Sequence, residues 1–183
     1  MEQNAIGLIE LSSIAGGYEV ADLMLKTADV ELILARTICS GKYMALIGGD
    51  VAAVTASIKA GSDIQPGAVI DSMVIPRVHR SLFGALAGTN EIPELESLGI
   101  IESFSVASLL VAADAAVKSA SVTLLEIRLA MALGGKAFAT LTGEVAAVRS
   151  AVEVGADLLA KQGLLVNKVV IPAPRPELLR DYV

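Results

Sequence analysis

The first half of the chain alternates short apolar runs with segments whose apolar residues recur at helical spacing. Such runs are typical of buried strands, and the helical segments have an apolar face. Asp50 is a suitable N-cap for the second helix, and Gly61 stands where a C′ glycine is common. The pattern predicts strands over 5–11, 30–38, 43–47 and 69–75 and helices over 16–28 and 51–60. The order βαββαβ predicts a ferredoxin-like α+β unit, with both helices on one side of an antiparallel sheet.

The same pattern returns in the second half of the chain. With a shift of 92 residues, twelve of the thirty positions of 7–36 are identical to those of 99–128. The shift then grows to 94, and Gly-Asp-Val-Ala-Ala-Val at 49–54 meets Gly-Glu-Val-Ala-Ala-Val at 143–148. Val-Ile-Pro at 74–76 meets the same three residues at 170–172. Glycines, acids and prolines that match in register indicate an internal duplication, which shared alanine content cannot explain.

The duplication predicts two domains of similar size. The first domain is expected at 1–87 and the second at 98–183. A linker at 88–97 is expected between them, because Gly88, Asn90 and Pro93 interrupt regular structure there.

Composition and charge narrow the class of protein. Hydrophobic residues make up 54% of the chain and charged residues 19%. The longest run without a charge, 103–113, is 11 residues, whereas a membrane-spanning helix needs about 20. The N-terminus has no basic segment, so neither a membrane span nor a signal peptide is expected. A net charge of -6 argues against a nucleic-acid partner.

Two further features of the composition concern the surroundings of the protein. The chain has one cysteine, which excludes a disulfide within the chain and fits a reducing cytoplasm. The mean hydropathy of +0.67 is high for a chain with so few charges. Since a small protein exposes a large share of its surface, this favours self-association that covers part of it.

Together the repeated motifs resemble the bacterial microcompartment shell domain over nearly the whole chain. Each copy opens with Gly-(Leu/Ile)-Ile-Glu and continues with Ala-Asp-x-x-x-Lys-(Thr/Ser)-Ala-x-Val on its first helix. Gly-Lys, Gly-(Asp/Glu)-Val-Ala-Ala-Val and Val-Ile-Pro follow. The order of the motifs is similar to that of the tandem, non-permuted shell proteins. The segment 36–42, Arg-Thr-Ile-Cys-Ser-Gly-Lys, is similar to the tandem-domain shell protein of propanediol-utilisation microcompartments.

This resemblance implies a structural protein rather than an enzyme. The family forms flat, pseudo-hexameric homotrimers, which pack with other shell proteins into the facets of a shell in the cytoplasm. The shell encloses metabolic enzymes, so encapsulated redox enzymes are implied as partners, with no membrane and no nucleic acid. No Ser–His–Asp set supports an enzyme, because the chain has a single histidine, His79.

The resemblance also implies where an axial site would lie. The loop between the second and third strands of each copy faces the central axis in this family. Here the first pore loop contains Thr37, Ile38, Cys39, Ser40 and Gly41, and the second copy has 129–134. Four residues separate the matched Arg and Gly in the first copy and six in the second, so only three-fold symmetry remains. Ser40 stands where the family pattern has proline.

Cys39 is the candidate metal ligand. Seen alone, a single cysteine is usually a small buried hydrophobe, and an iron–sulfur cluster needs about four ligands. Three copies of Cys39 around a three-fold axis would supply three thiolates, and the resemblance implies a [4Fe–4S] cluster there, one per trimer. The alternatives are a plain shell tile with a metabolite pore, or a ferredoxin-like regulatory module that binds a metabolite.

The family also implies residues at the edges of the tile. Lys26 and Lys118 are the matched lysines of the first helices, and Arg77, His79 and Arg80 follow the last strand of the first copy. A lysine near a helix C-terminus can equally be a solvated residue favoured by the helix dipole. Contacts between tiles are therefore expected at these five positions.

Overall fold

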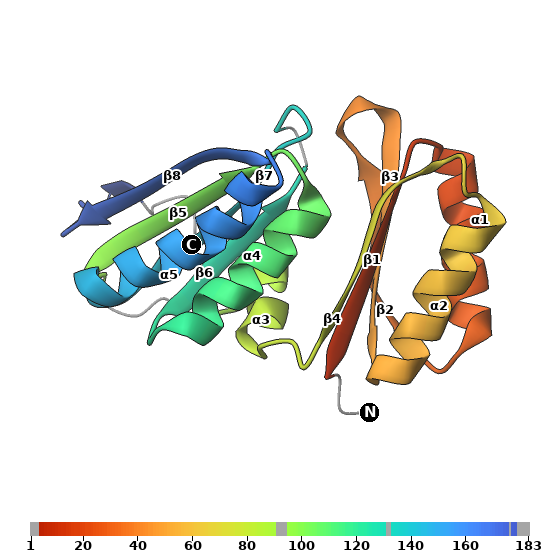
Figure 1. Ribbon diagram of the computed structural model, residues 1–183, viewed down its shortest axis with the longest axis horizontal. Coiled ribbons are helices and arrows are strands. Elements are labelled where there is room, and N and C mark those ends of the chain that lie inside the picture. The colour runs from red at the N-terminus through yellow and green to blue at the C-terminus, as the bar shows by residue number, and fades with distance from the viewer. Residues whose placement is uncertain (1–3, 91–94, 131–132, 176, 179–183) are drawn as a thin grey trace. The chain divides into compact units, whose positions relative to one another are not determined.

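The computed structural model describes residues 4–90, 95–130, 133–175 and 177–178. Its contacts divide the chain into two compact units. The first consists of Met1–Val78 with Ala130–Gly135, and the second of His79–Leu129 with Lys136–Val183. Each unit contains a four-stranded sheet with a pair of long helices on one face (Figure 1).

The first unit has the predicted order of elements. They are β1 (Ala5–Leu11), α1 (Ile14–Thr27), β2 (Glu31–Ile38), β3 (Lys42–Gly49), α2 (Val51–Ile64) and β4 (Val69–Pro76). The strands lie in the order β2-β3-β1-β4, and all neighbouring pairs are antiparallel. The prediction of a βαββαβ unit with an antiparallel sheet is therefore confirmed.

The core of the first unit lies between the sheet and its two helices. Alternate residues of β1 point to the helices, and Gly7 and Ile9 lie under α2. Apolar side chains of both helices and of β3 complete this core, namely Val20, Met24, Val54, Ile58, Tyr43, Ala45 and Ile47. β1 is buried along its whole length, as a strand in the middle of a sheet is expected to be.

The second unit repeats this arrangement. Its elements are α3 (Ser81–Ala87), β5 (Ser97–Ser103), α4 (Val106–Ser119), β6 (Thr123–Leu129), β7 (Ala137–Thr142), α5 (Val145–Lys161) and β8 (Leu165–Pro172). The strand order β6-β7-β5-β8 matches that of the first sheet, again with antiparallel pairs. The duplication in sequence is thus a duplication of fold.

One sequence prediction about the second helix was wrong. Asp50 caps α2 as expected, because its carboxylate accepts hydrogen bonds from the N–H groups of Ala52 and Ala53. However, α2 runs on to Ile64, so Gly61 lies inside the helix and not after it. A Cβ at Gly61 would stand 2.8 Å from Cδ1 of Ile9 and 3.0 Å from Cγ of Met24. The glycine therefore allows α2 to approach α1 and the sheet closely.

The short helix α3 was not predicted. It packs against β6, and Asn90 strengthens this contact by donating hydrogen bonds from Nδ2 to the carbonyls of Ser81 and Leu124. Contacts therefore assign 79–87 to the second unit, although the sequence places them at the end of the first domain. Residues 91–94 of the predicted linker lie outside the described residues.

Within the described ranges, no helix combines the length and the apolar character needed to cross a bilayer.

Candidate functional site

The predicted axial loop of the first copy is a tight turn. β2 ends at Ile38, Cys39–Gly41 form one turn of 3-10 helix, and β3 begins at Lys42. Ser40 has φ 66° and ψ 28°, which is the left-handed region, and Gly41 has φ 71°. Proline fixes φ near −65°, so the family's proline could not adopt this conformation at position 40.

Cys39 is held through its backbone, and its residue surface is partly exposed. Its N–H donates a hydrogen bond of 3.1 Å to the carbonyl oxygen of Ala130. Ala130 is fully buried and has φ 49°, an uncommon conformation for a residue with a Cβ. A backbone hydrogen bond therefore joins the two predicted axial loops within the first unit. Residues 131 and 132 of the second loop lie outside the described residues.

The surroundings of Cys39 fit a thiolate ligand but not a complete metal site. A partly exposed cysteine at a turn can reach a metal outside its own chain, and thiolate is a preferred ligand for iron. Within the described part of the chain, no three His, Cys, Asp or Glu side chains gather where they could hold a metal ion. One chain contributes one thiolate, so any cluster at Cys39 needs cysteines from other copies.

Two of the repeated motifs are partners in an ion pair. Nζ of Lys42, from Gly-Lys, lies 2.8 Å from Oε1 of Glu10, from Gly-x-Ile-Glu. In the second copy Lys136 and Glu102 form the same pair at 2.6 Å. Glu10 is almost completely buried, so the lysine provides the charge and the hydrogen bond that a buried carboxylate requires. Both glutamates therefore have a structural role, and Lys42 anchors β3 directly after the Cys39 turn.

The two predicted edge lysines have different surroundings. Lys26 is strongly exposed, with 71% of its side chain accessible, and pairs with the exposed Asp22. Lys118 is 39% accessible and pairs with Asp114, whose side chain is only 9% accessible. A surface pair such as Lys26–Asp22 contributes little to stability. Lys26 is therefore available to an outside partner, whereas Lys118 neutralises a buried acid.

The remaining predicted edge residues lie on the segment between β4 and α3. Arg77, His79 and Arg80 are all exposed, and Arg77 has φ 49°. Nδ1 of His79 is 2.8 Å from Oγ of Ser81, and the His79 N–H donates to Oδ1 of Asp114 at 2.8 Å. His79 and Lys118 thus meet at the same carboxylate of the second unit. Arg77 belongs to the first unit, and Arg80 precedes α3 in the second.

An exposed apolar face on α1 was missed by the sequence prediction. Ile14, Tyr18 and Leu25 are 40%, 65% and 39% exposed. Their counterparts on α4 are Val106, Leu110 and Val117, which are 1%, 0% and 6% exposed. These residues recur at helical spacing on one face of each helix. The apolar face could therefore have been found by aligning the two copies. Periodicity alone, however, cannot say which of two equivalent faces is covered.

Burial changes the pKa of two side chains on the strands that flank the Cys39 turn, Arg36 on β2 and Tyr43 on β3. Desolvation lowers the pKa of the Arg36 guanidinium, on β2 close to the Cys39 turn. Burial also raises the pKa of the Tyr43 hydroxyl, with a smaller contribution from the nearby Tyr18. The rings of Tyr18 and Tyr43 have centroids 5.0 Å apart at an angle of 45°. Tyr43 therefore keeps its proton to a higher pH than an exposed tyrosine does.

The family model and the curated relatives that match this chain point to the same family. The BMC domain model matches residues 5–78 and 97–174. The chain is 41% identical over 179 residues to bacterial microcompartment shell protein PduT of Citrobacter freundii, covering 98% of this chain and 97% of that protein. It is 30% identical over 184 residues to the carboxysome assembly protein CcmO of Synechocystis sp., covering 92% of this chain and 61% of that protein.

Solved structures agree with these relatives. A microcompartments protein from Desulfitobacterium hafniense DCB has a TM-score of 0.91 and 49% identity, with 96% of this chain and 98% of that chain covered. A fused permuted hexameric shell protein from the RMM microcompartment has a TM-score of 0.62 at 24% identity, with coverage of 85% and 81%, and shares the fold. The relatives with curated names have shell and assembly roles, in agreement with the prediction of a structural protein and not an enzyme. With two BMC domains in tandem, the chain belongs to the BMC-domain family of bacterial microcompartment shell proteins.

Proposed function

We propose that this shell protein is a facet tile made of three chains, and that three Cys39 thiolates near its axis hold one [4Fe–4S] cluster. The proposal has two parts, the assembly of the tile and the ligation of the cluster. Different residues support them, and different experiments test them.

The contrast between α1 and α4 is the observation that carries the assembly. A face containing Ile14, Tyr18 and Leu25 is exposed on α1, while the equivalent face of α4 is buried. Burial of apolar surface contributes about 25 cal/mol per Å², and contiguous exposed apolar side chains often mark an interface. We infer that a second copy of the chain covers this face, because two BMC domains per chain leave a pseudo-six-fold ring incomplete.

Symmetry then favours three chains. A contact between the α1 face of one copy and a different surface of the next is head-to-tail, and such contacts close into a ring when the rotation allows it. Two BMC domains per chain provide two positions of a pseudo-six-fold ring, so three chains complete it. Only 19% of the residues are charged, and Lys26 is exposed. Both features suit further packing of these rings with other shell proteins.

Cys39 supports the cluster through its place in the fold. It is the only cysteine of the chain, it lies in the turn between β2 and β3, and it is partly exposed. Its backbone N–H is fixed by the Ala130 carbonyl, which restricts where the side chain can reach. Three such thiolates leave one iron of a four-iron cluster with an outside ligand.

A bound cluster would supply one-electron transfer, which the side chains of this protein do not provide. The role of the protein's own residues is to bind iron through Cys39 and to orient Cys39 through its backbone. The proposed partners are other shell proteins in the facet and redox enzymes enclosed by the shell.

Light scattering of the purified chain near neutral pH tests the assembly. A homogeneous trimer is expected, followed by flat sheets under electron microscopy at higher concentration. A homogeneous monomer or dimer would contradict the tile. A discrete trimer that never forms sheets would favour a regulatory module instead.

Iron and acid-labile sulfide assays under anaerobic conditions test the cluster separately. Reconstituted wild-type protein should approach four irons per three chains, and Cys39→Ala should bind no stoichiometric iron while remaining folded. Equal iron in the two proteins would rule out ligation by Cys39 and leave a plain tile with a metabolite pore.

A further inference from the structure

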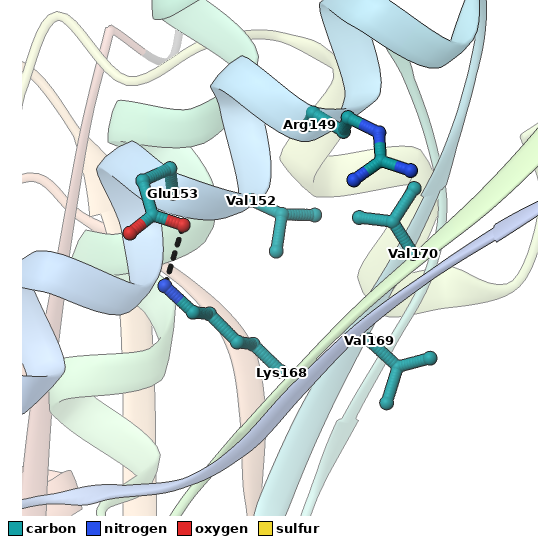
Figure 2. Close-up of a pocket in the computed structure, with 6 residues that line it drawn as sticks. All are labelled: Arg149, Val152, Glu153, Lys168, Val169 and Val170. Carbon is teal, nitrogen blue, oxygen red and sulfur yellow. Dashed lines mark hydrogen bonds and ion pairs between the residues drawn. The ribbon is translucent and has the colours of Figure 1, made fainter.

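A small hollow lies between α5 and β8 in the second unit. Its volume is about 240 Å³, and six residues line it, Arg149, Val152, Glu153, Lys168, Val169 and Val170. Figure 2 shows Arg149, Val152 and Glu153 on the helix, above Lys168 and Val170 on the strand. A water molecule occupies about 30 Å³ of the liquid, so the hollow has room for a compact ligand of several heavy atoms.

The polar groups of the hollow carry a net positive charge. Nζ of Lys168 pairs with Oε2 of Glu153 at 2.5 Å, which neutralises one cation. Arg149 is exposed and has no hydrogen-bond or ion-pair partner among the described residues, so its five N–H donors remain available. Lys168 also retains donors that Glu153 does not use. An otherwise acidic chain therefore presents a local cationic site here.

The second copy alone has this set of residues. The aligned positions of the first copy are Thr55, Lys59 and Ser72, in place of Arg149, Glu153 and Lys168. There the Thr55 hydroxyl donates to the carbonyl of Val51, and Lys59 pairs with Asp63. The arrangement is thus not required by the repeated fold, which would be satisfied by the residues of the first copy.

We propose that this hollow binds a small aliphatic carboxylate. The planar fork of Arg149 matches a carboxylate in bidentate fashion, and Lys168 adds a second cation from the opposite side. Val170 is partly exposed and provides a small apolar surface for a short hydrocarbon chain, while Val152 also lines the hollow but is only 2% exposed. A site this small and open binds weakly, with a dissociation constant of about 1–10 mM. Cys39 and the exposed face of α1 lie in the first unit, so neither contributes a residue to this site.

Titration of valine methyl resonances in the full chain tests this proposal. At constant ionic strength, butyrate should shift the Val152 and Val170 methyl signals saturably and bind more tightly than acetate. Arg149→Gln should weaken butyrate binding at least about fivefold, since the bidentate contact is lost. Glu153→Gln should strengthen it about threefold, because the competing carboxylate is removed. Lys59→Gln, at the aligned position of the first copy, is the matched control and should change nothing.

Several results would overturn the proposal. These are the absence of saturable shifts up to about 50 mM butyrate, unchanged affinity in Arg149→Gln, or weaker binding in Glu153→Gln. Inorganic phosphate binding as tightly as butyrate would also overturn it, since the apolar wall would then play no part. Circular dichroism of each variant confirms that the exposed substitutions leave the fold intact.

Discussion

The carboxylate of Asp114 accepts a hydrogen bond from the backbone N–H of His79 at 2.8 Å. Asp114 lies on α4, and His79 lies just before α3, so this bond fixes the start of α3 on the second unit. Lys118 pairs with the other carboxylate oxygen at 2.6 Å. The equivalent Asp22–Lys26 pair of α1 is exposed and, among the described residues, no side-chain hydrogen bond joins it to another element. The same motif therefore has a structural role in one copy and leaves its lysine available in the other.

This difference predicts opposite phenotypes for the two matched lysines. Lys118→Asp should lower the free energy of unfolding by about 1–3 kcal/mol, because buried Asp114 loses its cation and faces a second acid. Lys26→Asp should leave the free energy of unfolding nearly unchanged, since exposed pairs contribute little. It should instead disrupt sheets while the trimer remains. Urea denaturation and electron microscopy of both variants measure these effects, and intact sheets of Lys26→Asp would remove Lys26 from the tile edge.

The exposed face of α1 predicts an assembly mutant. Tyr18→Asp places a charge in the centre of this face and should shift the protein from trimer to monomer at micromolar concentration in light scattering. Phe104→Asp is the matched control, because Phe104 is 59% exposed and its counterpart Ser12 in the other copy is exposed as well. A trimeric Tyr18→Asp protein would show that the α1 face does not form the interface.

The two matched helix glycines predict a graded loss of stability. A Cβ at Gly155 would meet the carbonyl oxygen of Ala112 at 2.9 Å, whereas at Gly61 the close atoms belong to side chains. Backbone cannot move aside as easily as the end of a side chain. Gly155→Ala should therefore cost about 1–3 kcal/mol and Gly61→Ala less. Urea midpoints at equal protein concentration compare them, and an equal or reversed order would contradict this packing.

Tyr43 predicts a dependence of stability on alkaline pH. Burial raises its pKa in the folded protein above the value of about 10 in the unfolded chain. Its contribution is therefore complete below about pH 10 and is lost as the pH rises through the folded pKa. As the pH rises above about 10, the wild-type protein should lose more stability than Tyr43→Phe, which has no hydroxyl to ionise. If the urea midpoints of the two proteins change with pH by the same amount, the Tyr43 hydroxyl is not linked to folding.

Much of the fold could be predicted from the sequence, because β1 and β4 are short apolar runs, β4 ends at Pro76, and the long helices have an apolar face. The duplication added a second reading of each element. The predictions failed where tertiary packing outweighs the local sequence signal. Gly61 resembles a helix terminator, but tight packing against Ile9 keeps it inside α2. Helix α3 has only seven residues, too few to show a period, and it depends on Asn90 and on its contact with β6.

The candidate site was predictable in its residues but not in its geometry. Cys39 stands out as the only cysteine, and the motifs around it locate the turn. The left-handed Ser40 and the hydrogen bond to Ala130 could not be predicted, because they depend on a contact between residues far apart in the chain. For the same reason the sequence offered Lys26 and Lys118 as equivalents, although only one of their acidic partners is buried.

Native mass spectrometry after anaerobic reconstitution measures the central claim most directly. The account predicts one dominant species with three times the 18.8 kDa chain mass plus the mass of four irons and four sulfides. Cys39→Ala should give the same trimer without this added mass, since the two cores lie away from the turn. Wild-type trimers that carry no added mass, or a Cys39→Ala trimer that carries the same added mass, would contradict a cluster shared by three Cys39 thiolates.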